Sequence, residues 1–157
     1  ISPRQAFYTV VDAMQMFNQT MTLFCRFGPP KADAFIRAVI YGVFMDSAAA
    51  NNRSPHYAKS ADRALLLIPF SAAEGYVAPH VWQTMTPAAR KNHWSLQPGD
   101  IVVEGVATLA DGESAAALLT RTKSFLITTV DEKQTNNAMA HFAIGCGRTY
   151  RYGGGVA

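Results

Sequence analysis

The stretch Trp94-Ser-Leu-Gln-Pro-Gly-Asp-Ile-Val-Val-Glu-Gly105 decides the fold class. Pro98-Gly99-Asp100 is typical of a turn, because proline presets one backbone angle of a turn and glycine adopts conformations that other residues avoid. The β-branched run after the turn favours a strand over residues 101–108. Trp94, just before the turn, can cover one open end of a core. The stretch therefore predicts a turn that sets the register of a β-strand.

The rest of the chain from Thr20 onward has the same texture of short β-prone runs that end at turn residues. Gly42 is a possible bulge inside one run, and Pro69 ends another because proline cannot donate to a ladder. We expect strands over residues 20–27, 34–45, 63–70, 101–108, 124–130 and 140–144. This pattern predicts a mainly β protein, a small antiparallel β-barrel or sandwich.

Short helices are expected at two places inside this β-rich region. One begins around Pro79, and Thr86-Pro87 supplies a cap and a first residue for a second turn. The other covers residues 114–122, where Ser114 is the expected N-cap of an Ala- and Leu-rich run. Neither helix is long enough to change the fold class.

Residues 1–19 form a predicted N-terminal arm. Ser2, Pro3 and Gln5 suit the start of a helix, and the apolar residues that follow are spaced to form one stripe: Phe7, Val10, Val11 and Met14. The spacing predicts a helix, but the β-branched residues in this run lower helix propensity, so an extended arm is kept as the alternative. Because the first residue is Ile1 rather than Met, we expect that upstream residues were removed or left out of the numbering.

We expect three parts: the arm at 1–19, a barrel-like domain at 20–147 and a flexible tail at 148–157. Within the domain, residues 48–60 lack sustained periodicity and predict a long loop. The chain is 49% hydrophobic, which is enough apolar material for one core. Only 16% of its residues are charged, which indicates either a surface partly covered by partners or an ordinary surface rich in small Ala and Ser residues.

Composition argues against several classes of protein. The net charge of +3 is too small, and its basic residues too scattered, to indicate nucleic-acid binding. No apolar run reaches the roughly 18 residues of a membrane span. Cys25 and Cys146 lack metal-ligand spacing and are expected to be buried free thiols, so we expect synthesis in a reducing cytoplasm.

No catalytic, cofactor-binding or metal-binding residue is predicted. The histidines stand in unrelated contexts without metal-ligand spacing: His56, His80, His93 and His141. Asp100 and Glu104 would lie about 13 Å apart along a strand, too far to share a proton. The sequence also lacks a phosphate-binding loop and a nucleophile elbow. We therefore expect a protein that is not an enzyme and has no small-molecule substrate.

A barrel of this size could instead bind single-stranded nucleic acid by base stacking. The aromatic residues available for this are Phe24, Phe27, Phe35, Tyr41, Phe44 and Phe125. Aromatic residues that alternate along strands are more often core residues, and few basic residues accompany these. The nucleic-acid reading is therefore kept as the weaker alternative.

An ordered series of segments resembles a family of minor capsid or head-closure proteins of long-tailed bacteriophages. The segments are Arg63-Ala-Leu-Leu-Leu-Ile-Pro-Phe70, Gly75-Tyr-Val-Ala-Pro-His-Val-Trp82, Trp94 to Gly105 as quoted above, Lys123-Ser-Phe-Leu-Ile-Thr-Thr-Val130 and His141-Phe-Ala-Ile144. The likeness covers about residues 20–145, and it rests on the order and spacing of the segments together. The extension before Thr20 and the 48–60 loop depart from the family pattern.

This resemblance implies a structural protein of the head-tail connector, located in the neck of the virion. Its copies would form a homo-oligomeric ring that contacts portal, adaptor and tail proteins, with packaged DNA passing through or abutting the ring. The expected contacts between subunits are Phe7, Val10, Val11, Met14, Asn51, Asn52, Arg53, Arg148, Tyr150, Arg151 and Tyr152. A tail-terminator, tail or capsid-decorating protein remains the alternative within the virion.

Overall fold

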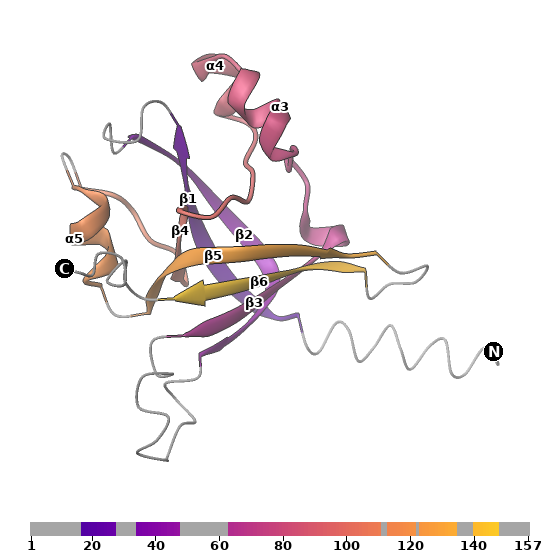
Figure 1. The fold of residues 1–157 in the computed structure, drawn as a ribbon. Coiled ribbons are helices and arrows are strands. Elements are labelled where there is room, and N and C mark those ends of the chain that lie inside the picture. Colours follow the sequence, from indigo (N-terminus) through magenta and orange to yellow (C-terminus); the bar gives the residue numbers. More distant parts are fainter. Residues whose placement is uncertain are drawn as a thin grey trace.

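A computed structural model of the chain describes residues 17–27, 34–47, 63–110, 113–121, 123–134 and 140–147. Within them, six antiparallel strands close into a barrel in the order β1-β2-β3-β6-β5-β4 (Figure 1). The strands are β1 (Gln19–Phe27), β2 (Ala34–Ser47), β3 (Ala64–Pro69), β4 (Ile101–Glu104), β5 (Ser124–Lys133) and β6 (His141–Gly147). The prediction of a mainly β fold, a small antiparallel barrel, is confirmed.

The register of β1 against β2 contains the bulge predicted at Gly42. Gln19 opposes Val43 and Thr20 opposes Tyr41, so Gly42 is the extra residue. Its φ is +81°, a backbone conformation that residues with a side chain rarely adopt. The other side of β1 pairs with β4 from Met21↔Glu104 to Phe24↔Ile101, and this pairing closes the barrel.

β4 covers 4 residues, from Ile101 to Glu104, whereas the sequence predicts a strand over residues 101–108. β4 ends at Glu104 rather than continuing to residue 108, because the chain turns at Gly105, where φ is +85°. The Gly105 N–H donates to the carbonyl of Thr20, and the Thr22 hydroxyl donates to the Gly105 carbonyl at 2.8 Å. The chain therefore leaves the sheet at Gly105 and crosses over β1.

The barrel interior is filled by side chains that alternate along every strand, as the pleat requires. Apolar residues on successive strands interdigitate there, and the two tryptophans lie at one end. This interior cluster comprises Met21, Leu23, Cys25, Ile40, Val43, Met45, Ala64, Leu66, Ile68, Trp82, Trp94, Leu96, Val102, Phe125, Ile127, Phe142, Ile144 and Cys146.

A second apolar layer lies outside the barrel, over β1, β4 and β5. The predicted helix near Ser114 is α5 (Ala115–Leu119), capped by the Ser114 hydroxyl, which accepts from the Ala117 N–H at 3.1 Å. The buried residues of this layer are Phe24, Ile101, Val103, Ala115, Leu118, Leu119 and Leu126. The outward faces of these strands are thus covered, which explains why their runs are apolar without clear alternation.

The remaining helices lie at one end of the barrel (Figure 1). They are the 3-10 turn η2 (Phe70–Ala72), α3 (Pro79–Thr84) and α4 (Pro87–Arg90). Thr86 caps α4 as predicted, because its hydroxyl accepts from the Ala89 N–H at 3.2 Å. No helix in the described part of the chain is long and apolar enough to cross a membrane.

Candidate functional site

Three segments of the chain join the barrel at the same rim. Because neighbouring strands are antiparallel, the start of β1, the end of β2, the start of β3 and the end of β6 lie at the same rim. Ser47 opposes Ala64, and Ala64 opposes Cys146. We call this the attachment rim. The segments 1–16, 48–62 and 148–157 all join the barrel there.

The opposite rim, which we call the capped rim, is covered by α3 and α4. The Trp82 indole N–H donates to the carbonyl of Arg26 at 3.2 Å, and Trp82 is fully buried. The Arg90 guanidinium lies 5.2 Å from the ring centre of Phe27 and 5.4 Å from that of Trp82. It also donates to the carbonyls of Trp82 and Gln83. These contacts fix the helices to the end of β1.

Trp94 completes the cap from the other side. Its indole N–H donates to the carbonyl of Glu74 at 3.0 Å, and a parallel bridge joins it to Tyr76. The Tyr76 ring contacts the rings of Trp94 and Phe142, with centres 5.4 Å and 4.7 Å away. The prediction that Trp94 covers an open end of the core is consistent with this position.

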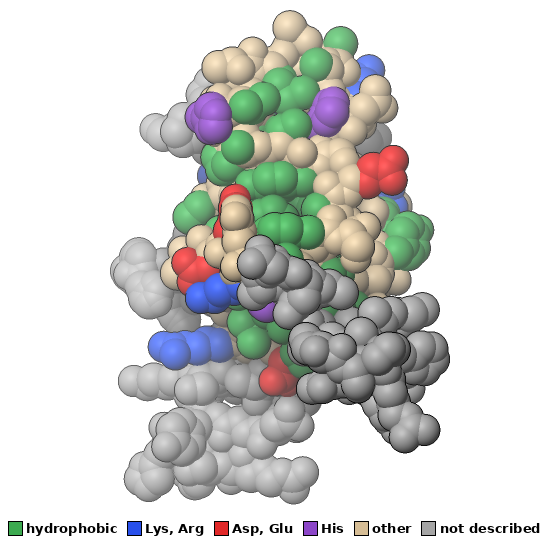
Figure 2. Space-filling model, turned by 90° about the vertical axis from the view of Figure 1, so that its right-hand side faces the viewer, with side chains coloured by type: hydrophobic (Ala, Val, Ile, Leu, Met, Phe, Trp, Pro, Cys, Tyr) green, Lys and Arg blue, Asp and Glu red, His purple; other side chains and the backbone are tan. Residues whose placement is uncertain are grey.

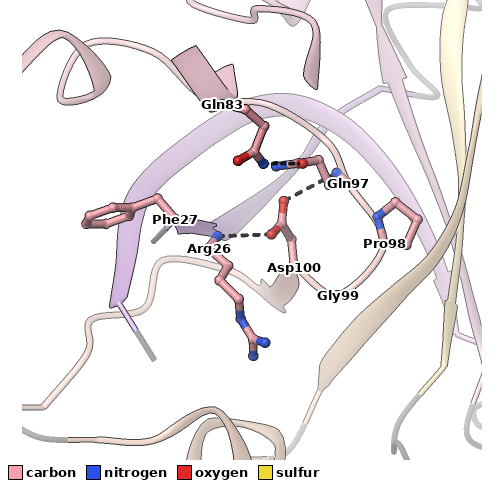
Figure 3. Close-up of a pocket in the computed structure, with 7 residues that line it drawn as sticks. All are labelled: Arg26, Phe27, Gln83, Gln97, Pro98, Gly99 and Asp100. Carbon is pink, nitrogen blue, oxygen red and sulfur yellow. Dashed lines mark hydrogen bonds between the residues drawn. The ribbon is translucent and has the colours of Figure 1, made fainter. Parts of the chain in front are cut away.

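Asp100 lies in a hollow of about 160 Å³ at the capped rim (Figure 3). The hollow is lined by Arg26, Phe27, Gln83, Gln97, Pro98, Gly99 and Asp100. One carboxyl oxygen of Asp100 accepts from the Arg26 N–H at 2.9 Å, and the other accepts from the Gln97 N–H at 3.3 Å. The regular pairing of β1 with β4 ends at Phe24. The Asp100 carboxyl therefore continues this pairing by one further hydrogen bond.

Burial controls the ionisation of this carboxyl. Asp100 is 1% exposed, and burial raises the pKa of its carboxyl to about 7. The two backbone N–H groups and the charge of Arg26 oppose this rise. No second carboxyl or histidine lines the Asp100 hollow. The group can hold a proton near neutral pH, but the lining offers no partner for acid-base chemistry.

Elsewhere in the described residues, charged side chains meet in pairs, such as Arg121 with Glu113. No three His, Cys, Asp or Glu side chains in that part of the chain are grouped to hold a metal ion. His93 lies by the carbonyl of Gly75, and Glu104 is paired with Lys123. The two cysteines are buried and unbridged, and burial raises the pKa of the Cys146 thiol to about 12. Burial also raises the pKa of the Cys25 thiol, so both thiols are expected to be protonated at neutral pH.

The residues predicted to contact other subunits lie outside the described residues. This holds for those of the N-terminal arm, for Asn51, Asn52 and Arg53, and for those of the tail. The structure describes only the strand ends from which these segments continue. Their contacts stay a prediction.

Most of the aromatic residues considered for base stacking are buried or partly buried. Phe24 and Phe125 are buried, and the ring of Phe35 packs edge-on against Phe24 with centres 6.2 Å apart. Tyr41 is the exception, with 66% of its surface exposed. The described residues thus provide no row of exposed rings along a strand.

Sequence reasoning missed a second hollow, of about 390 Å³, between β2 and the segments around Ser71 and Asn92. Val39 and Tyr41 line it on the β2 side, and Ile40 and Trp94 also contribute to its lining. We call it the β2-edge hollow. The available signal was Tyr41, a tyrosine next to the predicted bulge. The sequence could not show that its side chain is exposed, because this depends on how far β3 runs alongside β2.

The surface around η2 and the tip of the β5–β6 pair is rich in apolar side chains. Seen from that side, a band of hydrophobic side chains runs down the described surface, with histidines at both of its edges (Figure 2). Phe70 and Val81 of the capped rim are among the exposed hydrophobic residues. Hydrophobic side chains therefore make up a large part of this face (Figure 2).

A model of the family described as "Family of unknown function (DUF6751)" matches residues 16–147, which is most of the chain. No curated protein and no solved structure matches.

Proposed function

The chain belongs to the DUF6751 family, and we propose that it is a structural virion protein of the phage head-tail connector. In this role its copies form a ring between the portal and its adaptor on one side and the tail on the other. The ring helps to close the head after DNA packaging.

The observation that carries the proposal is the attachment rim. The three segments expected to contact neighbours join the barrel at a single rim, through Gln19, Ser47 with Ala64, and Gly147. A subunit built this way can direct all three segments toward its neighbours from one end. Contacts that are individually weak then bind by avidity when they repeat around a symmetry axis.

The resemblance to minor capsid proteins supports the same role. The resembling segments after residue 63 contribute β3, β6, β5 and β4, which are consecutive neighbours in the barrel. They also contain the first residue of η2, most of α3, and Trp94 of the capped rim. The likeness therefore follows one connected part of the fold rather than scattered pieces.

Deletion of residues 148–157 tests the proposal. Phage particles that carry the deletion should lack this protein, while the purified variant keeps the far-UV circular dichroism and unfolding midpoint of the unaltered chain. A matched control removes only Gly153 to Ala157 and retains Arg148, Tyr150, Arg151 and Tyr152; it should join particles normally. Normal incorporation of the longer deletion would remove the tail from the contacts.

The location in the virion tests the role itself. Electron microscopy of intact particles, with a gold label on a tagged chain, should place the label at the neck. A label along the tail or on the capsid surface would contradict the connector role and favour another virion component. Retention of single-stranded DNA by the purified chain, falling steeply with salt, would favour the nucleic-acid alternative.

A further inference from the structure

Part of one edge of β2 pairs with no other strand among the described residues. β3 pairs only with Phe44 to Ser47 of β2, because it ends at Pro69, after which the chain turns into η2. Over Ala34 to Val43, the described residues pair with β2 only through β1. Unpaired strand edges offer a row of backbone donors and acceptors to another strand.

The hydrogen bonds of β1 with its other neighbour, β4, show which N–H and C=O groups of β2 point to this edge. The Arg26 N–H and the Thr20 carbonyl both form hydrogen bonds on the β4 side of β1. They therefore point away from β2, so their partners in the register, Phe35 and Tyr41, do not exchange hydrogen bonds with β1. The register has no shift between these two pairs, and backbone groups alternate in direction from one residue to the next. Val39 lies an even number of residues from both Phe35 and Tyr41, so its backbone groups also point away from β1. Val39 and Tyr41 direct their N–H and C=O groups to the open edge.

The β2-edge hollow lies beside these same two residues. Its lining includes the apolar residues Ile40, Ala72 and Trp94, and it also includes the polar residues Ser71, Glu74 and Asn92. A strand added to the edge of β2 would place alternate side chains on this side of the sheet. The hollow, of about 390 Å³, is large enough to take one of them.

We propose that this edge binds residues 1–16 of a neighbouring copy, which add to it as an extra strand. The inference rests on the proposed ring function and names the acceptor for the N-terminal arm. The described chain begins at Phe17, whose carbonyl oxygen lies 3.8 Å from the place of a Cβ atom on Gly42. The arm therefore starts close to β2, at the Gly42 bulge.

Length and sequence fit this occupant. Sixteen extended residues span about 50 Å, enough to leave one barrel and run along the next. The run Phe7-Tyr-Thr-Val-Val11 is aromatic and β-branched, a composition that favours a strand. Main-chain hydrogen bonds to Val39 and Tyr41 supply the binding, and one alternate side chain enters the hollow.

Photo-crosslinking of the full chain tests the contact directly. Tyr41 is replaced by p-benzoylphenylalanine, and equal amounts of ¹⁵N-labelled and unlabelled chains are assembled and irradiated. Crosslinked peptides identified by mass spectrometry should join position 41 to residues 1–16, with about half of the pairs carrying mixed labels. Crosslinks within one chain only, crosslinks to another region, or no crosslinks in assembled rings would overturn the inference.

Backbone substitution gives a second test with a matched control. Val39→Pro removes the edge-facing N–H, a change that edge strands tolerate, whereas Val39→Thr keeps the N–H and the β-branch. Val39→Pro should weaken ring assembly at least tenfold in concentration, with its unfolding midpoint near that of Val39→Thr. Rings that form normally with Val39→Pro would overturn this inference and leave the connector role standing. A chain that is absent from the neck would instead contradict the connector role.

Discussion

The two rims of the barrel differ in how they are built. At the capped rim, Trp82, Arg90 and Trp94 are buried and hydrogen-bonded to backbone carbonyls of other segments. At the attachment rim, the strands continue into the segments 1–16, 48–62 and 148–157. This difference separates the residues that stabilise the barrel from those proposed to bind partners.

Trp82→Ala should have the largest effect on stability. The change removes a fully buried side chain together with its hydrogen bond to the Arg26 carbonyl, so we expect a loss of about 3–5 kcal/mol in the free energy of unfolding. Urea unfolding measures this loss. Val81→Ala, at the exposed neighbouring position, should cost less than about 1 kcal/mol. Equal effects of the two changes would contradict the stabilising role assigned to Trp82.

The pH dependence of the free energy of unfolding should show the raised pKa of the Asp100 carboxyl. Its pKa is about 7 in the folded chain, against an ordinary value of 3.8, so rising pH deprotonates the unfolded state first. Between about pH 4 and 7 the free energy of unfolding should therefore fall by up to about 1.4 kcal/mol per pH unit through this group, and level off above.

Asp100→Asn serves as the reference for this measurement. The amide does not ionise, so the slope due to Asp100 should be missing when the two chains are compared by urea unfolding at each pH. Other carboxyl groups titrate equally in both chains and cancel. Identical pH profiles would mean that the carboxyl is ionised in the folded chain throughout this range.

The smallest effect on stability is expected for Tyr41→Ser, on the open edge of β2. Tyr41 is largely exposed, so the free energy of unfolding should change by less than about 0.5 kcal/mol. Ile40→Ser, one residue away but buried, should cost several times more. If Tyr41→Ser weakens ring assembly without changing the free energy of unfolding, Tyr41 contributes to partner binding and not to the stability of the barrel.

The local features of the fold could be predicted from the sequence. Pro69 ends β3, Gly42 forms a bulge and Thr86 caps α4, because each depends on the backbone chemistry of one residue. The end of β4 could not be predicted in the same way. It depends on Gly105 reaching the carbonyl of Thr20, far away along the chain.

The candidate site was less accessible to prediction. Pro98-Gly99-Asp100 was correctly expected to form a turn, but the binding of the Asp100 carboxyl to the Arg26 N–H depends on how β1 and β4 meet. The open edge of β2 likewise follows from where β3 stops accompanying it. Such long-range pairing leaves no local pattern in the residues involved.

The filled interior of the barrel has a consequence for passage through the proposed connector. Met21, Leu23, Leu66 and Ile144 are fully buried inside it, and Trp82 closes one end, so no duplex can thread a single subunit. A conduit would have to lie on the symmetry axis between copies. Its bore would then be set by the number of subunits and by the surfaces they turn inward, so substitutions in the interior would leave its diameter unchanged.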